Sequence, residues 1–252
     1  MAILVTRPQP DNEATGASLR ARGFDVLLAP MLRFEPVGLL DDPGADYAAI
    51  IVTSANALRA VESQLTGRLL DLPLFAVGER TAAAACRAGF ATVISAEGNA
   101  ADLRALVLAK ISNKAKNKKL RTVRPVLYLA GADLSRDLAG ELGEHGLEVV
   151  TRTTYRMVAS SVLPPEACDA IAANQVEAVL HYSARSAHAF LDAVRRAGVE
   201  ISALAVPQCC ISATVASILR EAGATRVTVA SSPDENALLN ALLGMLDRAL
   251  RP

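Results

Sequence analysis

The chain has 252 residues, of which 52% are hydrophobic and 4% aromatic, and its 26 basic and 26 acidic side chains balance. The balance argues against a generic nucleic-acid-binding protein, which needs a net basic face. No apolar run is long enough to span a bilayer, and no CxxC or metal-ligand spacing joins the four cysteines. We therefore expect a cytoplasmic α/β protein with an aliphatic core and with neither a nucleic-acid nor a membrane partner.

Apolar segments of strand length alternate with helical patterns along the chain. Strands are predicted near residues 2–6, 25–29, 49–53, 74–77, 92–95, 126–130, 147–151, 178–182, 208–212 and 226–230. Helices are predicted near residues 11–22, 55–65, 79–88, 99–111, 134–145, 165–173, 184–197, 213–222 and 234–250. This alternation predicts parallel sheets with right-handed crossovers, five strands to each of two domains.

The pattern of the first half returns in the second half. Residues 3–36, which begin ILVTRP and end MLRFEP, match residues 126–159, which begin VLYLAG and end TYRMVA, at an offset of 123. Two later pairs of segments follow in the same order: residues 48–57 match 177–186, and 76–96 match 210–230. An ordered set of matches of this kind indicates an internal duplication.

Periodicity alone leaves two pairings of these segments open. Sequential pairing needs one linker between two domains. Swapped pairing joins residues 1–34 and 160–252 into a discontinuous first domain around an inserted second domain of residues 40–152. It needs two crossings, for which the segments 31–39 and 153–161 are candidates. Both alternate like short strands, so that they could pair with each other.

Candidate binding residues follow the predicted strands, because ligands of open parallel sheets bind outside the carboxyl ends of the strands. Small and hydroxyl-bearing residues recur there: Thr53, Ser54, Gly78, Thr81, Gly131, Ser183 and Ser212. Backbone N–H groups and the dipole favour anions at helix N-termini. For any one of these residues helix capping is the simpler explanation. Two facing sets of such strand ends predict a cleft that binds several carboxylates or phosphates.

Other catalytic motifs are absent from the sequence. It contains no GxGxxG after the first strand, no GxxxxGK[ST] loop and no GxSxG elbow. His145, His181 and His188 have no acid–serine pairing that would make one of them a base, so we expect structural roles. The basic run 110–124 is interpreted as a solvated loop, with attraction of an anionic partner as the alternative.

A long opening stretch and several later motifs stand in a characteristic order. They are ILVTRPQPDNEATGASLRARGFDVLLAPMLRFEP, TSANAL, AVGERTA, YLAGADLSRDLAGELGEHGLEV, TYRM, HYSARSA, CISATVASILREAGA and VASSPDENALLNALL. Together they resemble the uroporphyrinogen-III synthase family over essentially the whole chain. The resemblance implies the swapped two-domain fold with a two-strand linker, and neither a metal nor an organic cofactor. It implies a lyase of heme biosynthesis that cyclises hydroxymethylbilane to uroporphyrinogen III, with loss of water and inversion of ring D.

The resemblance also implies roles for individual residues. Tyr155 in TYRM matches a frequent tyrosine of the family and is our candidate proton donor. Arg7 and Arg136 match arginines that could pair with substrate carboxylates. Val215 stands where some members carry threonine, which removes a hydroxyl there. The alternative function is a non-catalytic two-lobed binding protein or sensor for a small anionic ligand, and the default oligomeric state is a monomer.

Overall fold

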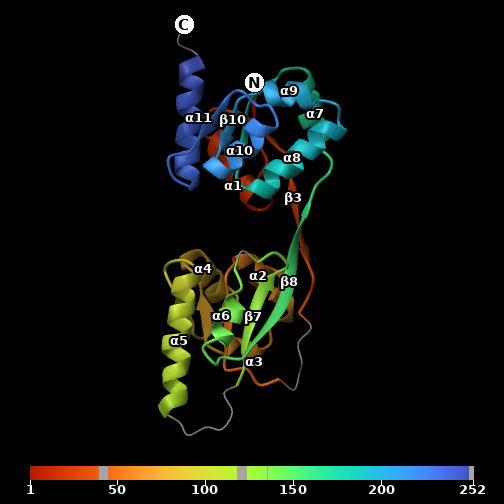
Figure 1. The fold of residues 1–252 in the computed structure, drawn as a ribbon. Helices are drawn as coiled ribbons and strands as arrows, with labels where there is room; N and C mark the ends of the chain where they lie inside the picture. Colours follow the sequence, from red (N-terminus) through yellow and green to blue (C-terminus); the bar gives the residue numbers. More distant parts are fainter. Residues whose placement is uncertain (40–44, 118–123, 135, 250–252) are drawn as a thin grey trace. The chain divides into compact units, whose positions relative to one another are not determined.

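The computed structural model describes residues 1–39, 45–117, 124–134 and 136–249 (Figure 1). The chain divides into two compact units: Met1–Phe34 with Val158–Pro252 form unit 1, and Glu35–Met157 form unit 2. Each unit holds one sheet dominated by parallel strands and covered by helices. The predicted α/β class is confirmed. That the two units are duplicated, separately folding domains stays a prediction.

The sheet of unit 1 contains five parallel strands in the order β11-β10-β9-β1-β2. These are β1 (Ala2–Val5), β2 (Asp25–Leu28), β9 (Val176–His181), β10 (Gln208–Cys210) and β11 (Val227–Val229). Strands from the beginning of the chain therefore pair with strands from its last third. β1 lies inside the sheet because it is apolar at every position, as a parallel strand buried on both faces must be.

Helices cover both faces of this sheet. They are α1 (Asp11–Arg20), α7 (Pro165–Ala172), α8 (Ala184–Arg196), α9 (Glu200–Ala205), α10 (Ala213–Glu221) and α11 (Glu235–Ala249). Ile3 of β1 packs in the core that contains Leu19 of α1 and Leu238 of α11. Leu4 packs in the opposite core with Phe190 of α8. Successive side chains of the strand thus supply both cores.

The sheet of unit 2 has six strands in the order β3-β8-β7-β4-β5-β6, one more than predicted. They are β3 (Leu32–Pro36), β4 (Ala49–Val52), β5 (Leu74–Ala76), β6 (Val93–Ser95), β7 (Val126–Gly131) and β8 (Val149–Ala159). The additional strand is β3. It covers the edge of β8, which would otherwise present unpaired backbone groups along its length.

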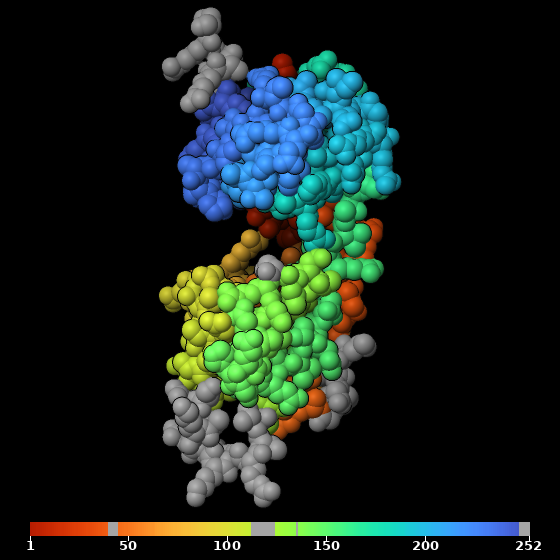
Figure 2. All heavy atoms as spheres, viewed as in Figure 1, coloured from red at the N-terminus to blue at the C-terminus, as the bar shows by residue number. Residues whose placement is uncertain are grey.

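The strands β3 and β8 lie side by side in the two predicted linker segments (Figure 1 and Figure 2). The Val37 N–H donates to the Thr154 carbonyl at 2.8 Å, and the Ser160 N–H donates to the Met31 carbonyl at 2.9 Å. Residue numbers rise along one strand as they fall along the other, so the pair is antiparallel. β8 continues from the sheet into the second linker segment without a break.

The helices of unit 2 are α2 (Ala55–Val61), the 3₁₀ turn η1 (Glu62–Gln64), α3 (Gly67–Leu70), α4 (Glu79–Arg87), α5 (Ala100–Asn117) and α6 (Leu138–Gly143). Ile51 and Tyr128 of the sheet pack in one core with Leu103 of α5 and Leu142 of α6. Of the basic run 110–124, residues 118–123 lie outside the described residues. No described helix combines the length and the apolarity needed to cross a membrane.

Candidate functional site

The predicted site residues of unit 1 lie at the carboxyl ends of three adjacent strands. Arg7 follows β1, Ser183 follows β9 and Ser212 follows β10, and these strands are neighbours in the order β10-β9-β1. The fold therefore brings the three positions to one edge of the sheet, where parallel α/β sheets bind ligands.

In unit 2 the corresponding edge carries most of the remaining predicted residues. Thr53 and Ser54 follow β4, Gly78 follows β5, and Gly131 ends β7, and these three strands are adjacent as β7-β4-β5. Tyr155 is in β8, which pairs with β7. The two sets of predicted residues thus each occupy one sheet edge, one set in each unit.

The three predicted serines are N-caps of helices. The side chains of Ser54, Ser183 and Ser212 each accept a hydrogen bond from a backbone N–H in the first turn of α2, α8 and α10, at 3.2, 3.1 and 3.4 Å. A cap satisfies one of the N–H groups that a helix leaves without an intrahelical partner. The local geometry of all three serines is accounted for by capping.

Arg7 is held by carboxylates of its own unit. Its Nη1 donates to Glu235 Oε2 at 2.8 Å and its Nη2 to Asp11 Oδ2 at 3.1 Å, while the guanidinium lies 4.8 Å from the ring centre of Tyr182. Glu235 also accepts a hydrogen bond from Thr15. A substrate carboxylate at Arg7 must therefore compete with these partners.

His181 at the end of β9 is buried, and its neighbour Tyr182 in the following loop is partly buried. Burial raises the pKa of Tyr182 to about 12. Burial also lowers the pKa of His181 to about 4. Gln208 donates its amide N–H groups to two backbone carbonyls and accepts from His181 Nε2 across 2.8 Å. His181 is consequently neutral at neutral pH and, being fully buried, fits a structural role.

Tyr155 lies next to a bulge at the end of β7. Ala130 pairs with Thr153, and the next residue, Gly131, pairs with Tyr155, so that β8 has one extra residue, Thr154. The Thr154 hydroxyl is buried and donates to the Ala130 carbonyl at 3.1 Å. Bulges of this kind redirect a side chain and are frequent beside active sites.

A second phenol belongs to the same edge of unit 2. The hydroxyls of Tyr128 and Thr53 are hydrogen-bonded at 3.0 Å. Burial raises the pKa of Tyr128, and the neighbouring Tyr155 raises it further, while the hydrogen bond to Thr53 opposes both effects. Thr53 is therefore hydrogen-bonded to Tyr128, which lies close to the candidate proton donor Tyr155.

The other predicted residues of unit 2 differ in accessibility. Gly78 is the N-cap residue of α4, and its carbonyl accepts from the Thr81 N–H at 3.1 Å. Thr81 is buried in the first turn of that helix. Arg136 is exposed and pairs with Glu141, which also accepts from Arg104 at 2.9 Å. The hydrogen bond from Arg136 holds the pKa of Glu141 below its usual value.

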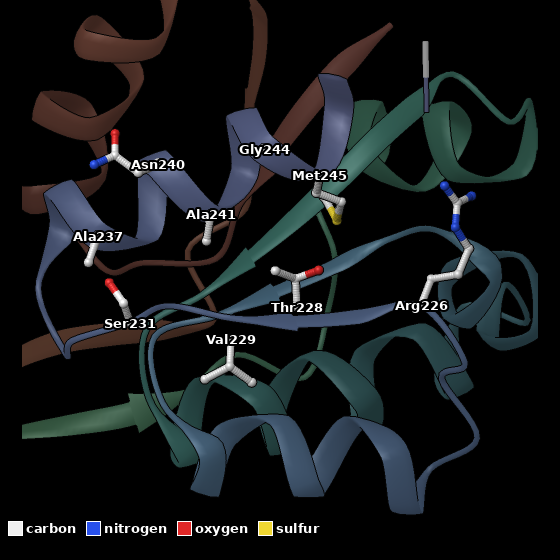
Figure 3. A pocket seen from close by; sticks show the side chains of 9 residues that line it. All are labelled: Arg226, Thr228, Val229, Ser231, Ala237, Asn240, Ala241, Gly244 and Met245. Atoms are coloured by element: carbon white, nitrogen blue, oxygen red, sulfur yellow. The ribbon is translucent and has the colours of Figure 1, made fainter. Parts of the chain in front are cut away.

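A groove of about 620 Å³ lies elsewhere in unit 1, between β11 and α11 (Figure 3). Thr228 of β11 and Ala241 and Met245 of α11 are directed into it. Its described lining includes none of the predicted site residues. Within the described residues, no three His, Cys, Asp or Glu side chains gather as a metal site requires.

Four residues at these two sheet edges are not among the predicted site residues: Tyr128, Thr154, Tyr182 and Glu235. Tyr182 directly precedes Ser183, and Glu235 is the first residue of α11, so both positions could be noticed in the sequence. Thr154 could not, because its role depends on the register of β8 against β7.

A model of the family described as uroporphyrinogen-III synthase HemD matches residues 13–240 of the chain. The fold is similar to that of uroporphyrinogen-III synthetase from Helicobacter pylori, with a TM-score of 0.64 and 20% identity over 97% of this chain and 99% of that one. It is also similar to a mutant uroporphyrinogen III synthase from Thermus thermophilus, with a TM-score of 0.51 and 17% identity over 98% and 100% of the two chains. Comparison with curated proteins finds no match.

Proposed function

Because the chain belongs to the uroporphyrinogen-III synthase HemD family, we propose that it is a lyase that converts hydroxymethylbilane to uroporphyrinogen III. The reaction closes a linear tetrapyrrole, expels water and inverts ring D. The observation that carries this proposal is the family match over residues 13–240. Cytoplasmic location and a monomeric state stay predictions.

The substrate is a polycarboxylate, and helix N-termini at the two sheet edges suit it. Ser54, Ser183 and Ser212 begin helices whose N-termini favour negative charge, and Gly78 begins a fourth. We propose that these N-termini bind the substrate carboxylates and thereby orient the reacting rings.

Side chains at the same edges would add to this binding. Arg7 would take a substrate carboxylate in exchange for Glu235, and Arg136 would take one in exchange for Glu141. The remaining proposed substrate-binding groups are the hydroxyls of Thr53 and Thr81.

Tyr155 is the proposed proton donor. Its phenol would protonate the terminal hydroxyl of hydroxymethylbilane as the carbon–oxygen bond breaks, so that water leaves and the positive charge stays on the pyrrole. Ring closure with inversion then releases a proton from carbon, which restores the phenol. The place of Tyr155 beside a bulge, at the edge that carries Thr53 and Gly131, supports this role.

A turnover experiment separates this enzyme from a binding protein for a small anionic ligand. Hydroxymethylbilane in large molar excess over the protein should be consumed completely, with uroporphyrinogen III as the product. A binding protein would retain at most a stoichiometric amount and leave the remainder to close without inversion. No observation on the described residues favours this second function.

A further inference from the structure

The bulge in β8 decides which residue faces the end of β7. In a regular ladder Thr154 would be opposite Gly131, but the register shifts and Tyr155 takes that place. The Thr154 hydroxyl donates to the Ala130 carbonyl at 3.1 Å, and the Ala132 N–H donates to the Tyr155 carbonyl at 2.8 Å. These two hydrogen bonds lie on either side of the shift, and they hold the backbone in it.

Gly131 leaves the space that the Tyr155 ring occupies. A Cβ built on Gly131 would lie 2.7 Å from Cζ, 2.9 Å from Oη and 3.1 Å from Cε1 of Tyr155. Non-bonded carbon atoms are normally about 3.5–4.0 Å apart. Any side chain at position 131 would therefore push the phenol away.

The backbone of Gly131 does not itself require glycine. Gly131 is not among the glycines with positive φ, a conformation that side chains rarely adopt. Glycine is therefore needed at position 131 for its lack of a Cβ and not for its conformational freedom. The close contact with the Tyr155 ring explains why the residue is glycine.

We infer that Thr154 and Gly131 are positioning residues that set the Tyr155 phenol for the reaction. The bulge at Thr154 turns Tyr155 toward the end of β7, and Gly131 leaves room for its ring. The inference rests on the proposed function, in which Tyr155 donates a proton. Proton transfer needs donor and acceptor within about 2.6–3.2 Å, so a displaced phenol loses its reach.

Gly131→Ala tests the inference through activity, with Gly143→Ala as the matched control. A Cβ on Gly143 would meet no atom within 4 Å. We expect Gly131→Ala to lower kcat for uroporphyrinogen III about tenfold to a hundredfold, with KM changed less than about threefold. Gly143→Ala should leave both constants unchanged. In a Tyr155→Phe background Gly131→Ala should not lower kcat further, because the hydroxyl that it displaces is already absent.

An unchanged kcat in Gly131→Ala would overturn the inference, and so would an equally large loss in the Tyr155→Phe background. Thr154→Val provides a second route, because it removes only the hydroxyl that holds the bulge. It should also lower kcat, and only when Tyr155 is present. This variant keeps the test decisive if Gly131→Ala does not fold.

A measurement without substrate separates this inference from the proposed function. The chain has four tyrosines, so a 3-fluorotyrosine-labelled protein should show four fluorine signals, and loss of one in Tyr155→Phe assigns it. Gly131→Ala and Thr154→Val should shift the Tyr155 signal, and Gly143→Ala should not. An unshifted signal would overturn the inference. Failure of the proposed function would show instead as a wild-type protein that forms no uroporphyrinogen III.

Discussion

Arg7 and Glu235 are separated by 228 residues in the sequence and joined by a 2.8 Å hydrogen bond between Nη1 and Oε2. Arg7 follows the first strand, and Glu235 begins the last helix. Asp11, the first residue of α1, is the second partner of the same guanidinium. One arginine thus ties the starts of two helices to the sheet edge at which we propose that substrate binds.

The ion pair predicts a measurable coupling between its partners. Arg7→Gln should lower the free energy of unfolding by about 1–2 kcal/mol, because it removes the positive charge beside two partly buried carboxylates. A double-mutant cycle with Glu235→Gln, measured by urea denaturation, should give a coupling of about 0.5–1 kcal/mol. Asp11→Asn, which affects an i,i+4 pair, should cost less than about 0.5 kcal/mol. A coupling near zero would show that Arg7 does not tie the last helix to the sheet.

Capping and anion binding at Ser183 can be separated with two substitutions. Asn and Asp are N-caps as good as Ser. The free energies of unfolding of Ser183→Asn and Ser183→Asp should therefore both lie within about 0.5 kcal/mol of the wild-type value. Only Asp adds a negative charge where a substrate carboxylate is proposed to bind. We expect KM to rise about tenfold in the Asp variant and little in the Asn variant. Equal KM values for both variants would remove this position from the binding site.

Burial of His181 predicts a pH dependence of stability. Its pKa is lowered to about 4 in the folded protein, from an ordinary value of 6.5. Between these values the unfolded chain binds a proton that the folded protein does not, so the free energy of unfolding decreases as pH falls from about 6.5 to about 4. The full loss is about 3 kcal/mol.

His181→Gln isolates that contribution, because it retains a donor for Gln208 and does not titrate. Urea denaturation at about pH 7 and about pH 5 should show a smaller decrease for this variant than for the wild type. The same decrease in both proteins would mean that His181 is not the group responsible.

Tyr155→Phe removes only the hydroxyl of the proposed proton donor. We expect kcat to fall about 10²-fold to 10⁴-fold, the usual contribution of a general acid, while the thermal midpoint changes little because Tyr155 is only partly buried. Steady-state kinetics and thermal denaturation on the same preparation check both expectations. Wild-type kcat in this variant would exclude the phenol as the acid.

Much of the fold is predictable because its strands are continuous apolar runs. β1 and β4 are buried on both faces, and such runs are visible without any tertiary information. The short helices α3 and α9 are not predicted, because four or six residues carry too little periodicity to be distinguished from a loop. The pairing of β3 with β8 joins the two segments that the sequence suggests could pair, but the place of β3 as the edge strand of the six-stranded sheet is not predicted, because it depends on how β8 continues from the sheet into the linker.

The candidate site is predictable only in its outline. Residues after parallel strands must reach one edge of a sheet, so Thr53, Ser183 and Ser212 can be placed there from the order of the elements. Their surroundings cannot, because the contact of Arg7 with Glu235 and the bulge in β8 arise from packing between distant segments. The order of the elements thus predicts which residues lie at the carboxyl ends of the strands, whereas their contacts depend on tertiary packing.

The isomer composition of the product tests the central claim most directly. Hydroxymethylbilane is supplied as the only substrate, the products are oxidised, and porphyrin isomers I and III are separated, with a reaction without protein as the control. The proposed function predicts isomer III as the main product with the protein and isomer I without it. Isomer I alone in both reactions would contradict the assignment of this chain as a uroporphyrinogen-III synthase.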